Sequence, residues 1–269
     1  MAVDDLLLFD TQSTYGAIAL EYDYASQHYG SFATQHALQL AGIAPGMSVL
    51  DAACGTGTAT LAAAERVRPG GRVVAVDFSP EMLALASEKA THRALLNIEW
   101  RLEDVTALEL PPGSFDVILC LLALYGVADM PALVARLWRL MRPGGRLLVA
   151  TKGEPYLAPL YDSFYAAARA TTPDLQPPQP WQRTQTPDQL RAVFDTARVP
   201  AGISQQTVTV PLREPADWWR IVRGTGLNRT ARLLGPAAAA RVEAANLQTI
   251  VEQNVTDLTS TFLYAVAHK

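Results

Sequence analysis

Cysteine and long apolar runs are scarce in this chain of 269 residues. Its two cysteines, Cys54 and Cys120, are too few for a disulfide framework, which agrees with a reducing cytoplasm. No run of about 18 consecutive apolar residues occurs, so we expect neither a transmembrane helix nor membrane insertion. The N-terminal sequence MAVDDLLLFD is acidic where an export signal needs a basic start, so we expect a cytoplasmic location.

Positive charge is also in short supply. The formal net charge is −4, from 22 basic and 26 acidic residues, and only Lys89, Lys152 and Lys269 are lysines. Nucleic-acid binding draws on positive surface charge, so this balance disfavours nucleic acid and favours a small-molecule substrate. No group of histidines, cysteines and acids has the spacing of metal ligands, so we expect no metal.

What the chain does have is an ordinary globular composition, with 49% hydrophobic and 18% charged residues. Short apolar runs alternate with helical patterns, which predicts a doubly wound α/β fold around a parallel sheet. The last two runs flank a helical insertion and suggest an antiparallel hairpin at the sheet edge. The predicted strands are residues 48–52, 72–77, 98–102, 115–122, 146–151, 205–211 and 259–267.

Helical patterns fill the intervals between these strands. Residues 13–40 lack proline and look like one or two helices, and further helices are expected at 58–67, 80–94, 131–141, 187–198 and 214–256. We expect a single domain over residues 1–269. Three segments would form a lid over the reacting group: the N-terminal helical segment 1–40 and two insertions at 153–186 and 213–257.

The segment VLDAACGTGT, residues 49–58, carries the clearest chemical signal. Gly55 and Gly57 allow a tight turn and close approach to a ligand, at the sheet edge where such folds bind ligands. A dinucleotide loop would need a third glycine where Thr60 stands, and Asp51 would bring negative charge near phosphates. An acid here suits a cationic ligand with an amino group, such as S-adenosylmethionine.

Two more acids follow the next strands. Asp77 ends the second strand and can accept hydrogen bonds from both hydroxyls of a ribose. Asp104 follows the third strand and can accept from an adenine amino group, while the backbone N–H of Val105 reaches a ring nitrogen. Plainer interpretations stay open, with Asp51 as a cap of the loop and Asp104 as a turn residue.

These segments together resemble the Rossmann-like (class I) S-adenosylmethionine-dependent methyltransferases, most closely the ubiquinone/menaquinone-biosynthesis type. VLDAACGTGTAT is similar to the family's first motif, VVAVDFSPEML to the second and LEDVTAL to the adenine-contact loop. FDVILCLLAL and MRPGGRLLVAT are similar to its fourth and fifth strands. The resemblance covers residues 15–152 and implies a seven-stranded, mostly parallel sheet with an antiparallel last strand. It also implies direct in-line transfer of the cofactor's methyl group.

The resemblance further implies which residues contact S-adenosylmethionine. The segment 15–23 is similar to the family's entry helix, which closes over the methionine end of the cofactor. Cys120 would line the cleft through its backbone, and both cysteines otherwise look like small core residues. The implied cofactor-binding residues are Tyr15, Tyr22, Asp51, Ala53, Gly55, Thr56, Gly57, Asp77, Phe78, Met82, Asp104, Val105 and Cys120.

The acceptor side matches no motif of the family. No Asn-Pro-Pro-aromatic motif follows the fourth strand, which disfavours methylation of adenine or glutamine nitrogens. A histidine base after the fifth strand is missing, so we favour an acceptor with acidity of its own: a phenol, an enol or a stabilised carbon nucleophile. His28 is the leading candidate for a catalytic base, although a lone histidine is more often structural.

Two residue groups and two rival functions stay open. Tyr15, Tyr22, Tyr29 and His36 recur every seven residues, the usual sign of packing. Arg220, Arg223, Arg229 and Arg232 form either a solvated face or an anion-binding patch. An enzyme with this fold and cofactor could instead catalyse cyclisation or another non-methylating reaction, and a binding protein could hold the cofactor without turnover. The sequence is also compatible with a homodimer.

Overall fold

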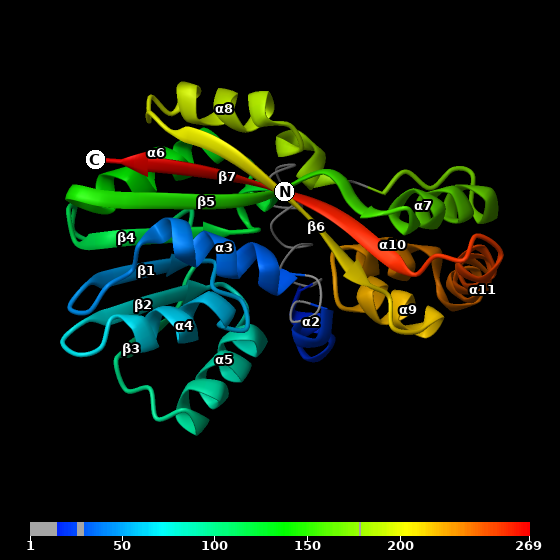
Figure 1. Cartoon of the computed structure of the whole chain (residues 1–269), viewed down its shortest axis with the longest axis horizontal. Helices are drawn as coiled ribbons and strands as arrows, with labels where there is room; N and C mark the ends of the chain where they lie inside the picture. The colour runs from blue at the N-terminus through cyan, green and yellow to red at the C-terminus, as the bar shows by residue number, and fades with distance from the viewer. Residues whose placement is uncertain (1–14, 26–29, 178) are drawn as a thin grey trace.

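The computed structural model describes residues 15–25, 30–177 and 179–269. Figure 1 shows one sheet with helices on both faces and a helical lobe beyond one end of the strands. The strands are β1 Ser48–Ala52, β2 Arg72–Asp77, β3 Ile98–Leu102, β4 Phe115–Leu121, β5 Met141–Ala158, β6 Gly202–Pro211 and β7 Asp257–His268. The helices beside the sheet are α2 Ala19–Ala25, α3 Ser31–Ala41, α4 Thr58–Arg66, α5 Pro80–His92, η2 Leu124–Gly126, α6 Met130–Leu140, η3 Pro180–Thr184 and α8 Pro187–Thr196.

The strands form one seven-stranded sheet in the order β3-β2-β1-β4-β5-β7-β6. The first five pair in parallel, while β7 runs antiparallel between β5 and β6. The predicted doubly wound fold with an antiparallel last strand is therefore confirmed. Its strand order reverses between β1 and β4, and ligands of such sheets bind at the carboxyl ends of the strands flanking this point.

The fifth strand differs from its prediction. Residues 146–151 were expected, but β5 extends from Met141 to Ala158. β4 ends where it pairs with Ala150, whereas Gly153 and Ala158 pair with β7. The last part of β5 therefore has a neighbouring strand on one side only. Pairing with a strand more than 100 residues later keeps this segment extended. The insertion expected to begin at residue 153 therefore starts as a strand.

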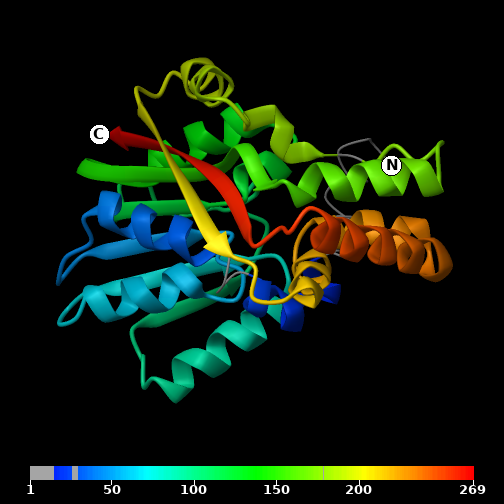
Figure 2. The same cartoon turned by 45° about the vertical axis from the view of Figure 1, so that its right-hand side comes forward.

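The late insertion, predicted as helical, forms three separate helices of the lobe. They are α9 Pro215–Arg223, α10 Leu227–Leu234 and α11 Pro236–Glu252, and α7 Leu160–Thr171 from the earlier insertion packs beside them (Figure 2). Gly224 separates α9 from α10 and lets α2 come close, because a Cβ there would lie 2.4 Å from the carbonyl oxygen of Glu21. Any residue other than glycine at position 224 would therefore push α2 away from the lobe.

The lobe has a core of its own. Trp218 is fully buried against Phe164 and Val242, and its indole N–H donates a 2.9 Å hydrogen bond to Oδ1 of the buried Asn246. Separate apolar clusters fill the two faces of the sheet. None of the helices in the described parts of the chain is long and apolar enough to cross a membrane.

Candidate active site

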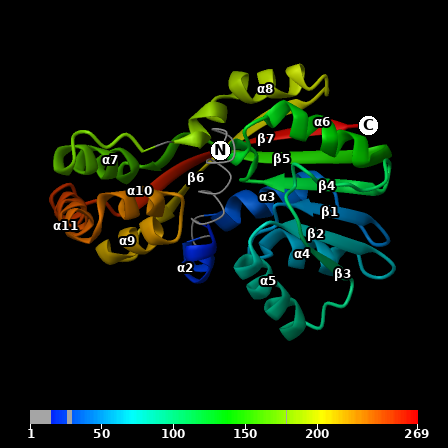
Figure 3. The same cartoon turned by 180° about the vertical axis from the view of Figure 1, so that it is seen from behind.

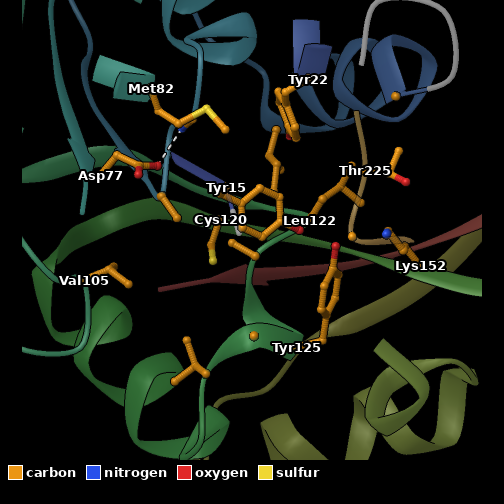
Figure 4. A pocket seen from close by; sticks show the side chains of 18 of the residues that line it. Tyr15, Tyr22, Asp77, Met82, Val105, Cys120, Leu122, Tyr125, Lys152 and Thr225 are labelled. Carbon is orange, nitrogen blue, oxygen red and sulfur yellow. Dashed lines mark hydrogen bonds between the residues drawn. The ribbon is translucent and has the colours of Figure 1, made fainter. Parts of the chain in front are cut away.

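A large pocket, here the main pocket, lies at the carboxyl ends of the parallel strands (Figure 4). It has a volume of about 1320 Å³ including its open mouth, and its walls come from the loops after β1 to β4, from α2 and from the lobe. The predicted cofactor residues that line it are Tyr15, Tyr22, Ala53, Gly55, Asp77, Phe78, Met82, Asp104, Val105 and Cys120.

Asp77 joins two of the loops that shape this pocket. Its Oδ2 accepts a hydrogen bond of 2.7 Å from the Gly55 N–H, and its Oδ1 accepts one of 3.0 Å from the Ser79 N–H. Burial raises the pKa of the Asp77 carboxyl, and the backbone donors partly oppose that effect. Gly55 has φ 54°, in the left-handed region that favours glycine. The result is a carboxylate at a wall that is otherwise mostly apolar.

Asp51, Thr56 and Gly57 do not line the main pocket. Asp51 is 1% exposed and its Oδ2 accepts a 2.5 Å hydrogen bond from the hydroxyl of Thr60. Burial raises the pKa of Asp51 from 3.8 to about 6, although the Thr60 hydrogen bond opposes the rise. Thr60, which stands where a dinucleotide loop has glycine, thus ties the start of α4 to the end of β1. Direct contact of these three residues with a cofactor stays a prediction.

The residues after β3 and β4 also have structural roles. Asp104 Oδ1 accepts a 2.8 Å hydrogen bond from the Thr106 N–H, as a turn residue would, while Asp104 still lines the pocket. Burial raises the pKa of the Cys120 thiol to about 12, so this thiol stays protonated near neutral pH. Cys54 and Cys120 are both buried and free of disulfides.

Helix α2 contributes Tyr22 and Ala25 to the lining of the main pocket, and it lies between α5 beside the sheet and α9 of the lobe (Figure 3). On the sheet side, Asp23 forms a 2.7 Å ion pair with Lys89 of α5 and accepts a hydrogen bond from the Thr56 hydroxyl. On the lobe side, the Tyr24 hydroxyl donates to Asp217 of α9 at 2.5 Å. The Arg220 guanidinium carbon lies 3.4 Å from the centroid of the Tyr24 ring.

A second pocket of about 620 Å³ opens beside the main pocket. Tyr125, Lys152 and Tyr156 line both pockets, so the two pockets adjoin. Aromatic side chains dominate the far wall: the Trp181 indole N–H donates to the Tyr161 hydroxyl at 2.7 Å, and that hydroxyl donates to Gln179 Oε1 at 2.6 Å. The second pocket is thus a firmly held aromatic chamber.

Lys152 and Tyr125 were not identified from the sequence as site residues. A signal for Lys152 did exist, since it is the first charged residue after the apolar run of β5, at the carboxyl edge of the sheet. Tyr125 offered none, because its position depends on the short helix η2, which follows the irregular residue Leu122 at φ 58°.

The histidine and arginine predictions have mixed outcomes. His28 and Tyr29 lie outside the described residues. His36 contacts the Tyr264 ring edge-on, with centroids 4.8 Å apart, and does not line the main pocket, as the packing interpretation expects. Of the arginines, Arg220 and Arg223 form ion pairs with Asp217 and Glu243, and Arg229 lines the second pocket. Among the described residues, no group of three or more histidines, cysteines and acids could hold a metal ion.

Residues 43–198 match the methyltransferase domain family, and this match covers more than half of the chain. The chain belongs to this family. It is 35% identical over 136 residues to the ubiquinone/menaquinone biosynthesis C-methyltransferase UbiE of Hydrogenovibrio crunogenus, covering 49% of this chain and 53% of that enzyme. It is 36% identical over 126 residues to the nocamycin O-methyltransferase of Saccharothrix syringae, covering 47% of this chain and 45% of that enzyme.

The chain thus spans about half the length of the curated relatives it matches. Among solved structures, the cyclase SpnF has a TM-score of 0.58 at 15% identity, covering 96% of this chain and 95% of that chain. At this identity the likeness concerns the fold alone. The resemblance to class I S-adenosylmethionine-dependent methyltransferases of the ubiquinone/menaquinone-biosynthesis type is confirmed.

Replacing Asp51 in this methyltransferase domain by asparagine should change its stability in a pH-dependent way. The folded-state pKa of Asp51 is raised, so its contribution to stability is present below pH 3.8 and is lost as the pH rises through about 6. Above about pH 6, where wild-type Asp51 carries a buried charge, Asp51→Asn should raise the free energy of unfolding by up to about 3 kcal/mol. Below pH 3.8, where Asp51 is neutral in both the folded and the unfolded state, the variant should be as stable as the wild type.

Urea unfolding at two pH values on either side of that window measures the effect. The exposed Asp174 provides a matched control, since Asp174→Asn makes the same chemical change without burial. A variant that is less stable than the wild type at both pH values would mean that the Asp51 charge itself supports the fold.

Asp77→Asn should weaken the binding of S-adenosylmethionine at least about tenfold, because hydrogen bonds to a charged group are worth about 1.5–3 kcal/mol each. Calorimetry measures the affinity, and circular dichroism checks that the variant is folded. Glu109→Gln, an exposed acid outside the pocket, is the control. Unchanged affinity in folded Asp77→Asn protein would remove Asp77 from the cofactor site.

Proposed function

We propose that this methyltransferase transfers a methyl group from S-adenosylmethionine to a small-molecule acceptor, with a phenol, an enol or a carbon nucleophile favoured. One observation carries the proposal: the main pocket, lined by the motif residues, lies directly beside an aromatic chamber. The two pockets share Tyr125, Lys152 and Tyr156. Cofactor and acceptor would therefore bind side by side in adjoining pockets.

The residues of the main pocket suit S-adenosylmethionine. Asp77 supplies a carboxylate for the ribose hydroxyls, Met82 and Phe78 supply apolar surface for the adenine, and Asp104 and Val105 supply polar groups for its edge. The carboxylates of Asp77 and Asp104 line this wall and disfavour a ligand with phosphates there. When bound, the cofactor supplies a methyl group on a positively charged sulfur, which makes the methyl carbon reactive.

The protein's own contribution is alignment and exclusion of water. The wall of the main pocket is mostly apolar, and residues of α2 and of the lobe form part of it. Holding two reactants in line in such a space can lower a reaction barrier by several kcal/mol, on the order of the proximity effects measured in intramolecular reactions. A good leaving group needs little further assistance from the protein.

The nature of the acceptor is supported by the shape of the site and by the relatives. Residues of α2 and of the lobe line the main pocket opposite the sheet loops, which favours a compact metabolite over a polymer. One relative is named a C-methyltransferase of quinone biosynthesis and another an O-methyltransferase. A phenol or an enol can react at either atom, since its anion shares charge between oxygen and carbon.

A methyl-transfer assay separates this function from its rivals. We expect incubation with S-adenosylmethionine and a panel of phenols and enols to yield one product that is heavier by one methyl group, with one S-adenosylhomocysteine formed per product. Mass spectrometry measures both. A product without S-adenosylhomocysteine would indicate a non-methylating reaction such as cyclisation, and tight binding without any product would indicate a binding protein.

We also propose that the described N-terminal residues act as a lid together with the two insertions. Residues 15–25 should gain protection from hydrogen exchange when S-adenosylhomocysteine binds. Asp23→Asn should reduce that gain, because it removes the charge that pairs with Lys89 at 2.7 Å. Asp174→Asn should leave it unchanged. If residues 15–25 exchange equally fast with and without the ligand, they do not form a lid.

A further inference from the structure

One lysine lies at the junction of the two pockets. Lys152 belongs to the part of β5 that extends beyond β4, and it lines both the main and the second pocket. In Figure 4 Lys152 lies on the opposite side of the pocket from Asp77 and Met82, and its amine end points into the same space as the Tyr125 hydroxyl. The amine is therefore on the side of the site that the motif residues leave to the acceptor.

The surroundings of this amine are aromatic. Its Nζ lies 4.4 Å from the centroid of the Tyr156 ring and 5.4 Å from that of the Tyr125 ring. Within residues 15–25, 30–177 and 179–269, no carboxylate oxygen is within 4.0 Å of it. The titratable groups that line the main pocket with Lys152 are Tyr15, Tyr22, Asp77, Glu103, Asp104, Cys120, Tyr125 and Tyr156. The second pocket adds Tyr161 and Tyr165 of α7 and Arg229 of α10.

Burial has opposite effects on the lysine and on its neighbours. It lowers the pKa of the Lys152 amine, so the neutral form becomes accessible at a lower pH than in an exposed lysine. It raises the pKa of Tyr22, Tyr125 and Tyr156, so those hydroxyls keep their protons. On this side of the site the lysine is thus better suited than the tyrosines to accept a proton.

We propose that Lys152 is the catalytic base, and that its Nζ accepts the proton of an acidic hydroxyl on the acceptor. In this step the O–H bond breaks, its electron pair stays on the acceptor oxygen, and the proton forms a new N–H bond on Nζ. The resulting ammonium pairs with the oxyanion in a mostly apolar space, where such a pair is stronger than in water.

The inference rests on the proposed function, because a base is of use here only if an acceptor binds. It narrows that function to phenols and enols, whose hydroxyls are acidic enough to give their proton to an amine. A carbon nucleophile remains included where its reactive form is the anion of an enol. Ordinary alcohols are excluded, since their acidity lies far below that of an ammonium group.

The test uses para-nitrophenol, whose ionised form is yellow, and the whole chain saturated with S-adenosylhomocysteine. Lys152→Met removes both the base and the charge, whereas Lys152→Arg keeps the charge but cannot accept a proton. Lys269→Met makes the same change as Lys152→Met at the end of the chain, outside both pockets. Absorbance reports ionisation of the bound probe. Calorimetry in buffers of different ionisation enthalpy reports the protons released.

In the wild type and in Lys269→Met, we expect the ratio of ionised to neutral probe to be about tenfold higher for the bound probe than for the free probe. This ratio corresponds to about 1.4 kcal/mol. Binding should release almost no protons to the buffer, because the proton passes to Nζ. Lys152→Met should bind the probe only in its neutral form. Lys152→Arg should bind the ionised probe and release about one proton for each molecule bound.

Three results would overturn the base role. The wild type could release as many protons as Lys152→Arg does, or Lys152→Met could bind the probe in its ionised form. The third is that the wild type does not bind the probe. Affinity for S-adenosylhomocysteine alone, measured first, should be equal in all four proteins. A wild type that fails to bind it would contradict the proposed function itself. With an acceptor from the methyl-transfer assay, both Lys152 variants should lose at least about 10²-fold in turnover.

Discussion

The antiparallel pairing of β5 with β7 is the constraint on which the rest of the structure depends. These strands continue past the point where β4 ends, and their extensions carry the chain from the sheet into the helical lobe (Figure 1). β7 pairs with β6 along this part, and the β5 extension pairs with β7 although β4 has ended, so strand pairing still satisfies backbone hydrogen bonds there. Without this pairing, Lys152 and Tyr156 would have no fixed position, and α7 would have no rigid connection to the sheet. The second pocket depends on the extension of β5 beyond the end of β4, because that extension carries Lys152 and Tyr156.

The short helix α2 is held by polar contacts at both ends of the site. Asp23 connects it to Lys89 and Thr56 beside the sheet, and Tyr24 connects it to Asp217 and Arg220 of the lobe. A helix of seven residues is marginal by itself and takes its stability from such contacts. Polar contacts of this kind exchange with water more readily than a packed apolar core does. They agree with the lid role proposed for this segment.

The distribution of charge divides the site into two functional ends. Carboxylates gather where the parallel strands end, with Asp77 at the wall and Asp51 buried behind it, and both are held by hydrogen bonds from nearby donors. The opposite end contains the amine of Lys152 within tyrosine rings. Acids suit a cofactor that carries positive charge, and an amine suits an acceptor that becomes an anion. The charges at the two ends of the site therefore agree with the transfer of a methyl group from a cationic cofactor to an anionic acceptor.

The sequence by itself determined the doubly wound sheet, the family and the part of the main pocket's lining that follows the first four strands, because these depend on local patterns: apolar strands, and acids or glycines directly after them. Asp77 and Val105 line the pocket for that reason. Only the tertiary structure decided that Asp51 and Thr56 support the loop from behind, since side-chain direction depends on neighbours such as Thr60 and Asp23. It also decided the length of β5, the three-helix lobe and the place of Lys152. Each of these depends on contacts between segments far apart in the chain, which no local pattern contains.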